Sequence, residues 1–147
     1  MDQWYGKLSV VTGASSGIGE SITTALLKNG VNVVGLARRL ENMRELKERM
    51  KDAKGTFYPV QCDLSREQDI LNAFKIVEKL GGPDILVNNA ALLYSGPISD
   101  AATNEMKMIL DVNVLAVAMC SREAIKSLKE RGAQGHIVNI NRCCFLR

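Results

Sequence analysis

The sequence predicts an α/β protein with a doubly wound parallel sheet, and three observations support this fold class. Short β-branched runs alternate with longer segments that carry apolar residues at helical spacing. The strand segments are nearly continuous apolar runs, which is typical of parallel strands covered by helices on both faces. Strand and helix patterns alternate along the whole chain, so right-handed crossover connections are expected.

The sequence of the first part of the chain predicts three strands and the two helices between them. Leu8–Thr12 is a strand that leads into a Gly-rich turn, and a helical stretch follows over Gly17–Asn29. Gly30 is expected to end that helix as its C-terminal cap. The next predicted elements are a strand at Val31–Ala37, a charged helix at Glu41–Ala53 and a strand at Phe57–Cys62.

The second part continues the same alternation. Ser65, with Gln68 three residues on, has the pattern of a capping box and is expected to open a helix that runs to Leu80. The remaining predicted elements are a strand at Asp84–Asn88, a loop at Ala90–Pro97, helical structure in one or two segments from Thr103 to about Glu130, and a strand at His136–Ile140.

Composition limits the class of protein. The chain has 147 residues, enough for one domain, and is 46% hydrophobic and 24% charged, as in soluble globular proteins. Its net charge of +3 is too small to favour nucleic acid or a membrane surface as a partner. No apolar run reaches the roughly 20 residues of a membrane span. The opening residues lack the apolar core of a signal peptide, so a cytoplasmic location is expected.

The cysteines and the histidine give no pattern of a metal site. Cys62, Cys120, Cys143 and Cys144 have no CxxC spacing, and His136 begins an apolar run. We therefore expect free thiols in a reducing compartment and no bound metal.

The Gly-rich turn is the strongest functional signal. It reads Thr12-Gly13-Ala14-Ser15-Ser16-Gly17-Ile18-Gly19 and lies between the first strand and the first helix. Gly13 permits a tight turn, Gly17 a close approach of the backbone to a pyrophosphate, and Gly19 close packing of the helix. The N-terminus of the helix then offers N–H groups to phosphate. An ordinary strand–turn–helix is the alternative, but the TGxxxGIG spacing in the first βα turn favours a dinucleotide.

The end of the second strand indicates which dinucleotide. NAD-selective sites place an acidic residue there, but this chain has Ala37 followed by Arg38 and Arg39. Two guanidinium groups suit the 2′-phosphate of NADP, which a carboxylate would repel. The alternative is a solvated pair of arginines at the start of a helix.

Polar residues also follow the third and fourth strands, at the edge where open α/β sheets bind ligands. Asp63 could accept a hydrogen bond from an adenine amino group, or it could be a turn residue ahead of Ser65. Asn88 and Asn89 could bond a ribose or the backbone of their own loop.

Together these motifs resemble the short-chain dehydrogenase/reductase family. The resemblance is carried in order by TGASSGIG, Cys62-Asp63-Leu64, Asn88–Ala91, Asp111-Val112-Asn113-Val114 and Gly135–Asn141. Within the family, the chain is similar to the NADP-dependent branch that contains farnesol dehydrogenases. The resemblance implies a Rossmann-type sheet of strand order 3-2-1-4-5, an incomplete NADP-binding domain over residues 1–141, and a tail at 142–147 that does not match.

The resemblance also implies roles for individual residues. Gly13, Ala14, Ser15, Ser16, Gly17, Ile18 and Gly19 would hold the pyrophosphate of NADP(H), and Arg38 and Arg39 the 2′-phosphate. Asp63 and Leu64 would hold the adenine, Asn89 and Ala90 the ribose, and Asn113 would support a proton-relay water. Ala91 replaces the Gly of the family's NNAG motif, which puts the shape of that loop in doubt.

The family transfers hydride between a nicotinamide and an alcohol or carbonyl, with a Ser and a YxxxK pair as the catalytic groups. Here Tyr5, Tyr58 and Tyr94 are followed four residues on by residues other than Lys, and Arg142 stands where the Ser is expected. We therefore expect the N-terminal part of an NADP-dependent oxidoreductase that by itself lacks turnover. The alternative is a fragment that binds NADP(H) or a protein partner without catalysis. The full-length form could be a homo-oligomer.

Such a part of the domain would leave apolar surface uncovered. The last strand would be an open edge that carries Ile137, Val138 and Ile140. Exposed apolar side chains are also expected on the long helix, namely Val114, Leu115, Val117 and Ala118. Marginal stability of the isolated chain is the consequence.

Overall fold

The computed structural model describes residues 2–141 and contains one five-stranded parallel sheet. The strand order is β3-β2-β1-β4-β5, which confirms the predicted order. The strands are β1 Leu8–Thr12, β2 Asn32–Ala37, β3 Phe57–Gln61, β4 Ile85–Asn88 and β5 His136–Asn139. The central strand β1 pairs on one side with β2 and on the other with β4, so that Val10 lies between Val34 and Leu86.

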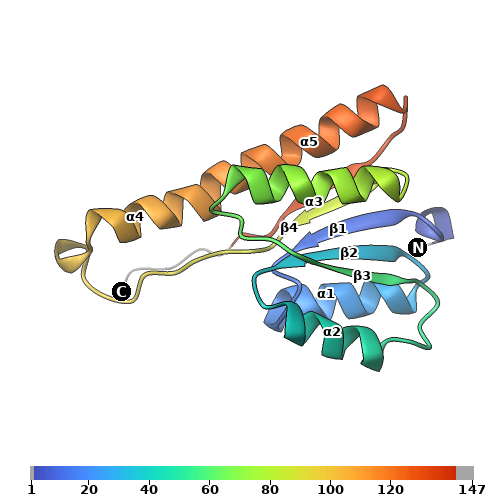
Figure 1. Cartoon of the computed structure of the whole chain (residues 1–147), viewed down its shortest axis with the longest axis horizontal. Coiled ribbons are helices and arrows are strands. Elements are labelled where there is room, and N and C mark those ends of the chain that lie inside the picture. Colours follow the sequence, from blue (N-terminus) through green and yellow to red (C-terminus); the bar gives the residue numbers. More distant parts are fainter. Residues whose placement is uncertain (1, 142–147) are drawn as a thin grey trace.

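Helices cover both faces of this sheet, as Figure 1 shows. The α-helices are α1 Gly17–Lys28, α2 Leu40–Arg49, α3 Glu67–Lys79, α4 Thr103–Leu110 and α5 Ala116–Glu130. Val11 and Val33 belong to the core under α1 and α2, whereas Val10 and Val34 belong to the core under α3 and α5. Because successive side chains point to opposite covered faces, every position of β1 must be suited to burial.

Of two predicted helix boundaries, the structure confirms one and contradicts the other. Gly30 ends α1 as expected, with φ of +82° and a hydrogen bond from its N–H to the carbonyl of Leu27. The capping box at Ser65 is wrong, because α3 begins only at Glu67. The N–H and hydroxyl of Ser65 instead donate to Oδ1 of Asp63, at 3.0 and 2.8 Å.

The long helical region from Thr103 to Glu130 is divided into two α-helices, which is one of the two arrangements that the sequence predicts. A π-helical turn at Asp111–Leu115 joins α4 to α5. No residue of α4 is buried, whereas α5 buries Ala116, Cys120 and Ala124 against the sheet. Figure 1 shows α4 extending beyond the end of the sheet.

Apolar side chains are exposed in this region, largely as predicted. Val114, Leu115 and Ala118 are exposed on the helical segment and Val117 is half-buried. On the β5 side, Val138 and Ile140 are 42% and 40% exposed, whereas Ile137 packs partly against the core.

The amino edge of the sheet is held together by one buried carboxylate. Asp84 accepts a hydrogen bond from the N–H of Leu8 at 2.9 Å and forms an ion pair with Arg131 at 3.4 Å. This pairing joins β1, the start of β4 and the end of α5 at the edge opposite to that of the Gly-rich turn.

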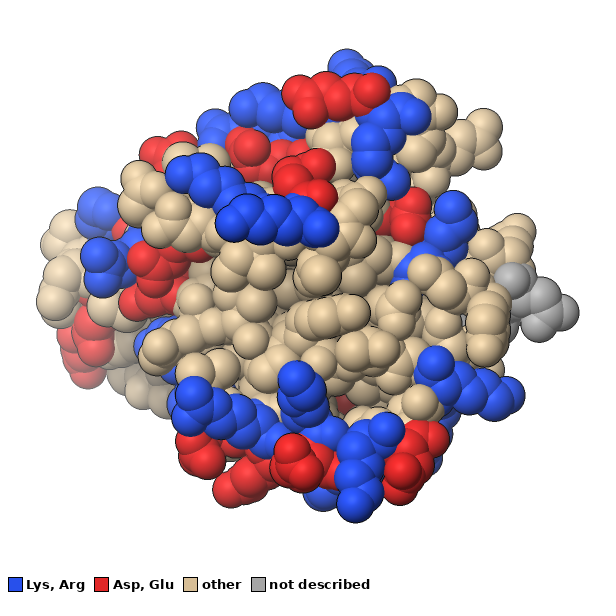
Figure 2. Space-filling model, turned by 45° about the vertical axis from the view of Figure 1, so that its right-hand side comes forward, with Lys and Arg blue, Asp and Glu red and all other residues tan. Residues whose placement is uncertain are grey.

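Charges of both signs cover the outer helices. Figure 2 shows them gathered above and below a band of uncharged side chains, with no large area of a single sign. Within residues 2–141, no helix has the length and apolar character needed to cross a membrane.

Candidate nucleotide-binding site

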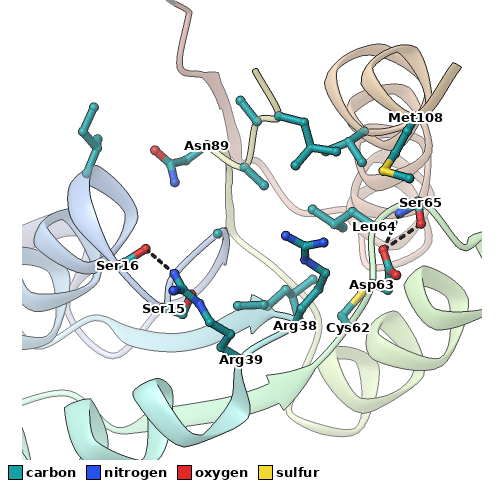
Figure 3. Close-up of a pocket in the computed structure, with 18 residues that line it drawn as sticks. Ser15, Ser16, Arg38, Arg39, Cys62, Asp63, Leu64, Ser65, Asn89 and Met108 are labelled. Atoms are coloured by element: carbon teal, nitrogen blue, oxygen red, sulfur yellow. Dashed lines mark hydrogen bonds between the residues drawn. The ribbon is translucent and has the colours of Figure 1, made fainter. Parts of the chain in front are cut away.

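A cleft of about 450 Å³ lies at the carboxyl edge of the sheet, a size typical of small-molecule sites. Its walls come from the Gly-rich turn, the ends of β2 and β3, the loop after β4, and α4 (Figure 3). The cleft brings together most of the candidate site residues: Gly13, Ser15, Ser16, Ile18, Arg38, Arg39, Asp63, Leu64, Asn89 and Ala90. Ala14, Gly17, Gly19 and Asn113 do not line it.

The glycines of the turn are required for different structural reasons. Gly13 and Gly17 adopt φ of +69° and +58°, a region that favours glycine. A Cβ on Gly19 would lie 2.2 Å from the carbonyl oxygen of Gly13, so only glycine lets α1 begin this close to the turn. A Cβ on Gly17 would meet no atom of the described chain, which leaves open space beside the backbone. Ala14 is fully buried and packs in the core beneath the turn.

The N-terminus of α1 has no side-chain cap. Ser16 is the N-cap residue, yet its hydroxyl makes no bond to the helix backbone. The Ser16 hydroxyl instead accepts a hydrogen bond from the guanidinium of Arg39 at 2.9 Å. The first N–H groups of a helix have no intrahelical partner and carry partial positive charge. This end of α1 is therefore suited to an anion.

The two arginines lie differently in the cleft. Figure 3 shows Arg39 directed toward Ser16 and Arg38 rising into the space between Asn89 and Leu64. Both side chains are exposed. The carbonyl of Arg38 accepts a hydrogen bond from the side chain of Gln61 at 3.1 Å, which ties the end of β2 to the end of β3. Positive charge thus flanks the cleft from two directions.

Asp63 lines the cleft and also organises its own turn. Its Oδ1 accepts both hydrogen bonds from Ser65, and its N–H donates to Asp69 at 3.1 Å. The side-chain hydrogen bond from Ser65 is the largest cause that lowers the pKa of Asp63, and the nearby Arg38 and Arg66 lower that pKa further. Asp63 is therefore a carboxylate at neutral pH and retains acceptor capacity beyond Oδ1.

Thr12 was not among the candidate site residues, but it positions two that were. Its hydroxyl oxygen accepts hydrogen bonds from the N–H groups of Asn89 and Ala90, both at 3.0 Å. The side chain of Asn89 returns a hydrogen bond to the carbonyl of Thr12, also at 3.0 Å. These bonds fix the turn after β4 against the Gly-rich turn. A threonine at the last position of the first strand is the sequence signal for this role.

Asn113 lies in the π-helical turn and bonds the loop after β4. Its Oδ1 accepts from the N–H of Leu92 and its Nδ2 donates to the carbonyl of Leu92, both at 2.8 Å. Ala91 precedes this tie, and no non-glycine residue in the described chain has positive φ, so the loop accommodates its methyl group. The side chain of Asn113 thus holds the loop in place.

Sequence reasoning also missed an apolar wall of the cleft, formed by Leu92, Met108 and Val112 beside Leu64. Cys62 and Cys120 are buried free thiols in the core cluster that also contains Leu64. Burial raises the pKa of each to about 12, so both are protonated at neutral pH. Cys143 and Cys144 lie outside the described residues. Within the part described, no three His, Cys, Asp or Glu residues are grouped as metal ligands.

A parallel sheet with a Gly-rich turn leading into an uncapped helix at its carboxyl edge defines a dinucleotide-binding α/β protein. The model of one family of such proteins, described as short chain dehydrogenase, matches residues 7–142. The chain belongs to this family of oxidoreductases, the short-chain dehydrogenases/reductases.

Relatives and solved structures agree with this assignment. The chain is 49% identical over 144 residues to a farnesol dehydrogenase of Aedes aegypti, covering 96% of this chain and 59% of that protein. It is 44% identical over 148 residues to dehydrogenase/reductase SDR family member 11 of Mus musculus, covering 98% of this chain and 57% of that protein. The chain thus spans somewhat more than half the length of these relatives.

Solved structures of the family superpose closely. A metagenomic short-chain oxidoreductase in complex with NADP has a TM-score of 0.88 and 32% identity, with 96% of this chain and 64% of that chain covered. The L-sorbose reductase from Gluconobacter frateurii, complexed with NADPH and L-sorbose, has a TM-score of 0.86 and 29% identity, with 92% and 52% covered. These neighbours support binding of a nicotinamide cofactor by this fold.

Proposed function

We propose that the protein is the NADP(H)-binding part of an NADP-dependent oxidoreductase, and that residues 1–141 form its cofactor domain. The observation that carries the proposal is the pair Arg38 and Arg39 beside the uncapped N-terminus of α1. Arg39 is already held by the Ser16 hydroxyl, so its guanidinium is oriented before any ligand binds. Guanidinium groups bind phosphate through two parallel hydrogen bonds, and a 2′-phosphate distinguishes NADP from NAD.

The residues of the cleft fit the pyrophosphate and adenosine parts of a dinucleotide. Backbone at Gly13–Ile18 would hold the pyrophosphate at the positive end of α1, where Gly17 leaves open space. Asp63 and Leu64 would take the adenine, and Asn89 and Ala90 the adjoining ribose. NADP(H), when bound, supplies a hydride for exchange with an alcohol or carbonyl. Asn113 would stabilise the loop next to the reacting end by its two bonds to Leu92.

The proposed substrate class is an alcohol or carbonyl similar to farnesol, and its support is the 49% identity to a farnesol dehydrogenase. None of Tyr5, Tyr58 and Tyr94 is followed four residues on by Lys. We therefore propose that these 147 residues bind NADP(H) without turnover. The buried thiols Cys62 and Cys120, unpaired as free cysteines, support a cytoplasmic location.

Calorimetric titration of NADPH and NADH tests the cofactor choice. The double variant Arg38→Ala/Arg39→Ala is expected to bind NADPH roughly 100-fold more weakly, since each lost charged hydrogen bond costs about 1.5 kcal/mol or more. Affinity for NADH should stay unchanged. Arg44→Ala is the matched control, because Arg44 pairs with Glu41 on α2 and does not line the cleft. Equal losses for NADPH and NADH would contradict the assignment of the 2′-phosphate to these arginines.

A further inference from the structure

Met108 is a chemically reactive side chain in the wall of the cleft. It lies on α4, is 48% exposed, and contributes to the apolar wall with Leu92 and Val112. Figure 3 shows its side chain at the end of the cleft formed by α4, and Leu64 and Ser65 line the same cleft. Its side chain is therefore open to solvent and lines the cleft that also contains the proposed adenine position.

We propose that Met108 is a reversible oxidation site that lowers the affinity of the cleft for NADP(H). The inference rests on the proposed function, since it assumes that the cofactor occupies this cleft. The oxidant is a hydroperoxide: its O–O bond breaks, one oxygen forms an S–O bond with the thioether, and an alcohol or water leaves. Sulfur is oxidised by two electrons and the peroxide is reduced by two. Methionine sulfoxide reductases reverse the change at the expense of thiols.

The effect is expected on binding rather than on folding. No residue of α4 is buried, so a polar sulfoxide on this helix disturbs no core packing. A thioether packs favourably against an aromatic ring, whereas a sulfoxide is polar and chiral. The rest of the wall is held independently, because Asn113 fixes Leu92 through its backbone. On this proposal, oxidation changes the polarity of one wall residue near the adenine position and leaves the cleft otherwise intact.

The chain itself contains the control. Among the described methionines, Met43 and Met119 are buried and Met50 is half-buried. Met106 is 37% exposed on the same helix but does not line the cleft. Met106 and Met108 thus share exposure and helix, and differ in contact with the cleft.

The experiment treats the free protein with hydrogen peroxide, maps sulfoxides by peptide mass spectrometry, and measures the dissociation constant for NADP⁺. Met106 and Met108 should oxidise, and NADP⁺ should protect Met108 alone. Oxidised wild type and oxidised Met106→Leu should bind NADP⁺ about tenfold more weakly than before treatment. Met108→Leu should keep its own affinity through the treatment. Met108→Gln should bind as weakly as the oxidised protein, and a sulfoxide reductase should restore wild-type binding.

Two results would overturn the inference while leaving the proposed function intact. One is unchanged affinity for NADP⁺ in wild type whose Met108 is fully sulfoxide. The other is a loss of affinity in peroxide-treated Met108→Leu equal to that of treated wild type. Failure of the untreated, folded protein to bind NADP⁺ would instead refute the proposed function, and the inference with it.

Discussion

Two regions of the molecule differ in how completely this chain buries them: the side of the sheet with β1 and β2, and the side with β5 and α4. β1 is buried at every residue and β2 at all but its first, whereas β5 has no fully buried residue. α1 and α2 pack on the first side through residues such as Leu27 and Leu46, whereas α4 buries none of its residues. The β1-β2 side is therefore well packed by the chain itself, and the side with β5 and α4 is not.

This difference separates two kinds of binding residue. Gly13, Ser16, Arg38 and Arg39 lie on the well-packed side, where the backbone that carries them is buried or hydrogen-bonded. Met108 and Asn113 lie on the other side, on helical segments with few buried contacts. We expect the phosphates of the cofactor to be held by the rigid side, and the adenine and the loop next to the reacting end to be contacted by a more mobile one.

The largest expected effect comes from closing the gap between the Gly-rich turn and α1. Gly19→Ala would place a methyl group 2.2 Å from the backbone oxygen of Gly13, which cannot move without displacing the turn. We expect a loss of about 3 kcal/mol in the free energy of unfolding, measured by urea denaturation. NADPH binding should fall as well.

Gly96→Ala is the control for that change. The atoms nearest to its new methyl group would belong to the side chain of Tyr94, in an exposed loop. A cost for Gly19→Ala no greater than that of Gly96→Ala would show that the turn is looser than described.

A matched pair of valines compares the two sides directly. Val34 in β2 is fully buried and Val138 in β5 is 42% exposed. Val34→Ala should lower the free energy of unfolding by about 2 kcal/mol, since it removes buried apolar surface and leaves a cavity. Val138→Ala should cost less than about 0.5 kcal/mol. Similar costs in urea denaturation would mean that β5 is covered in solution.

The smallest expected effect concerns Asp63 at low pH. Its folded pKa is lowered, so its contribution to stability is fully present above the unfolded value near 3.9 and is lost as the pH falls through the folded pKa. Ser65→Ala removes the main cause, so the pKa of Asp63 should rise, as followed by NMR titration of its carboxyl group. The stability difference between the two proteins should be fully present above the unfolded value and should shrink as the pH falls through the folded pKa of Asp63.

Ser99→Ala removes a comparable hydrogen bond to Asp100 and should leave the pKa of Asp63 unchanged. Equal pKa values for Asp63 in wild type and Ser65→Ala would contradict the role of Ser65.

The strands and most helices could be predicted because their signals are local. Continuous apolar runs identify strands buried on both faces, and Gly30 identifies the end of α1 by its conformation. The start of α3 was missed because Ser65 bonds Asp63, a choice between two local partners that spacing does not decide. The bonds of Thr12 to Asn89 and the wall formed by Met108 join residues far apart in the chain, so no local pattern reveals them.

The central position of β1 has a consequence for how the chain folds during synthesis. β1 can pair with β2 and carry β3 beside it soon after those segments are made, but its other edge waits for Ile85–Asn88. At ribosomal rates of about 5–20 residues per second, synthesis from the end of β3 to the end of β4 lasts roughly 1–5 s. Throughout that time the nascent chain presents an open apolar strand edge, a template for pairing with other chains. A chaperone that binds while the segment before β4 is synthesised would cover this edge.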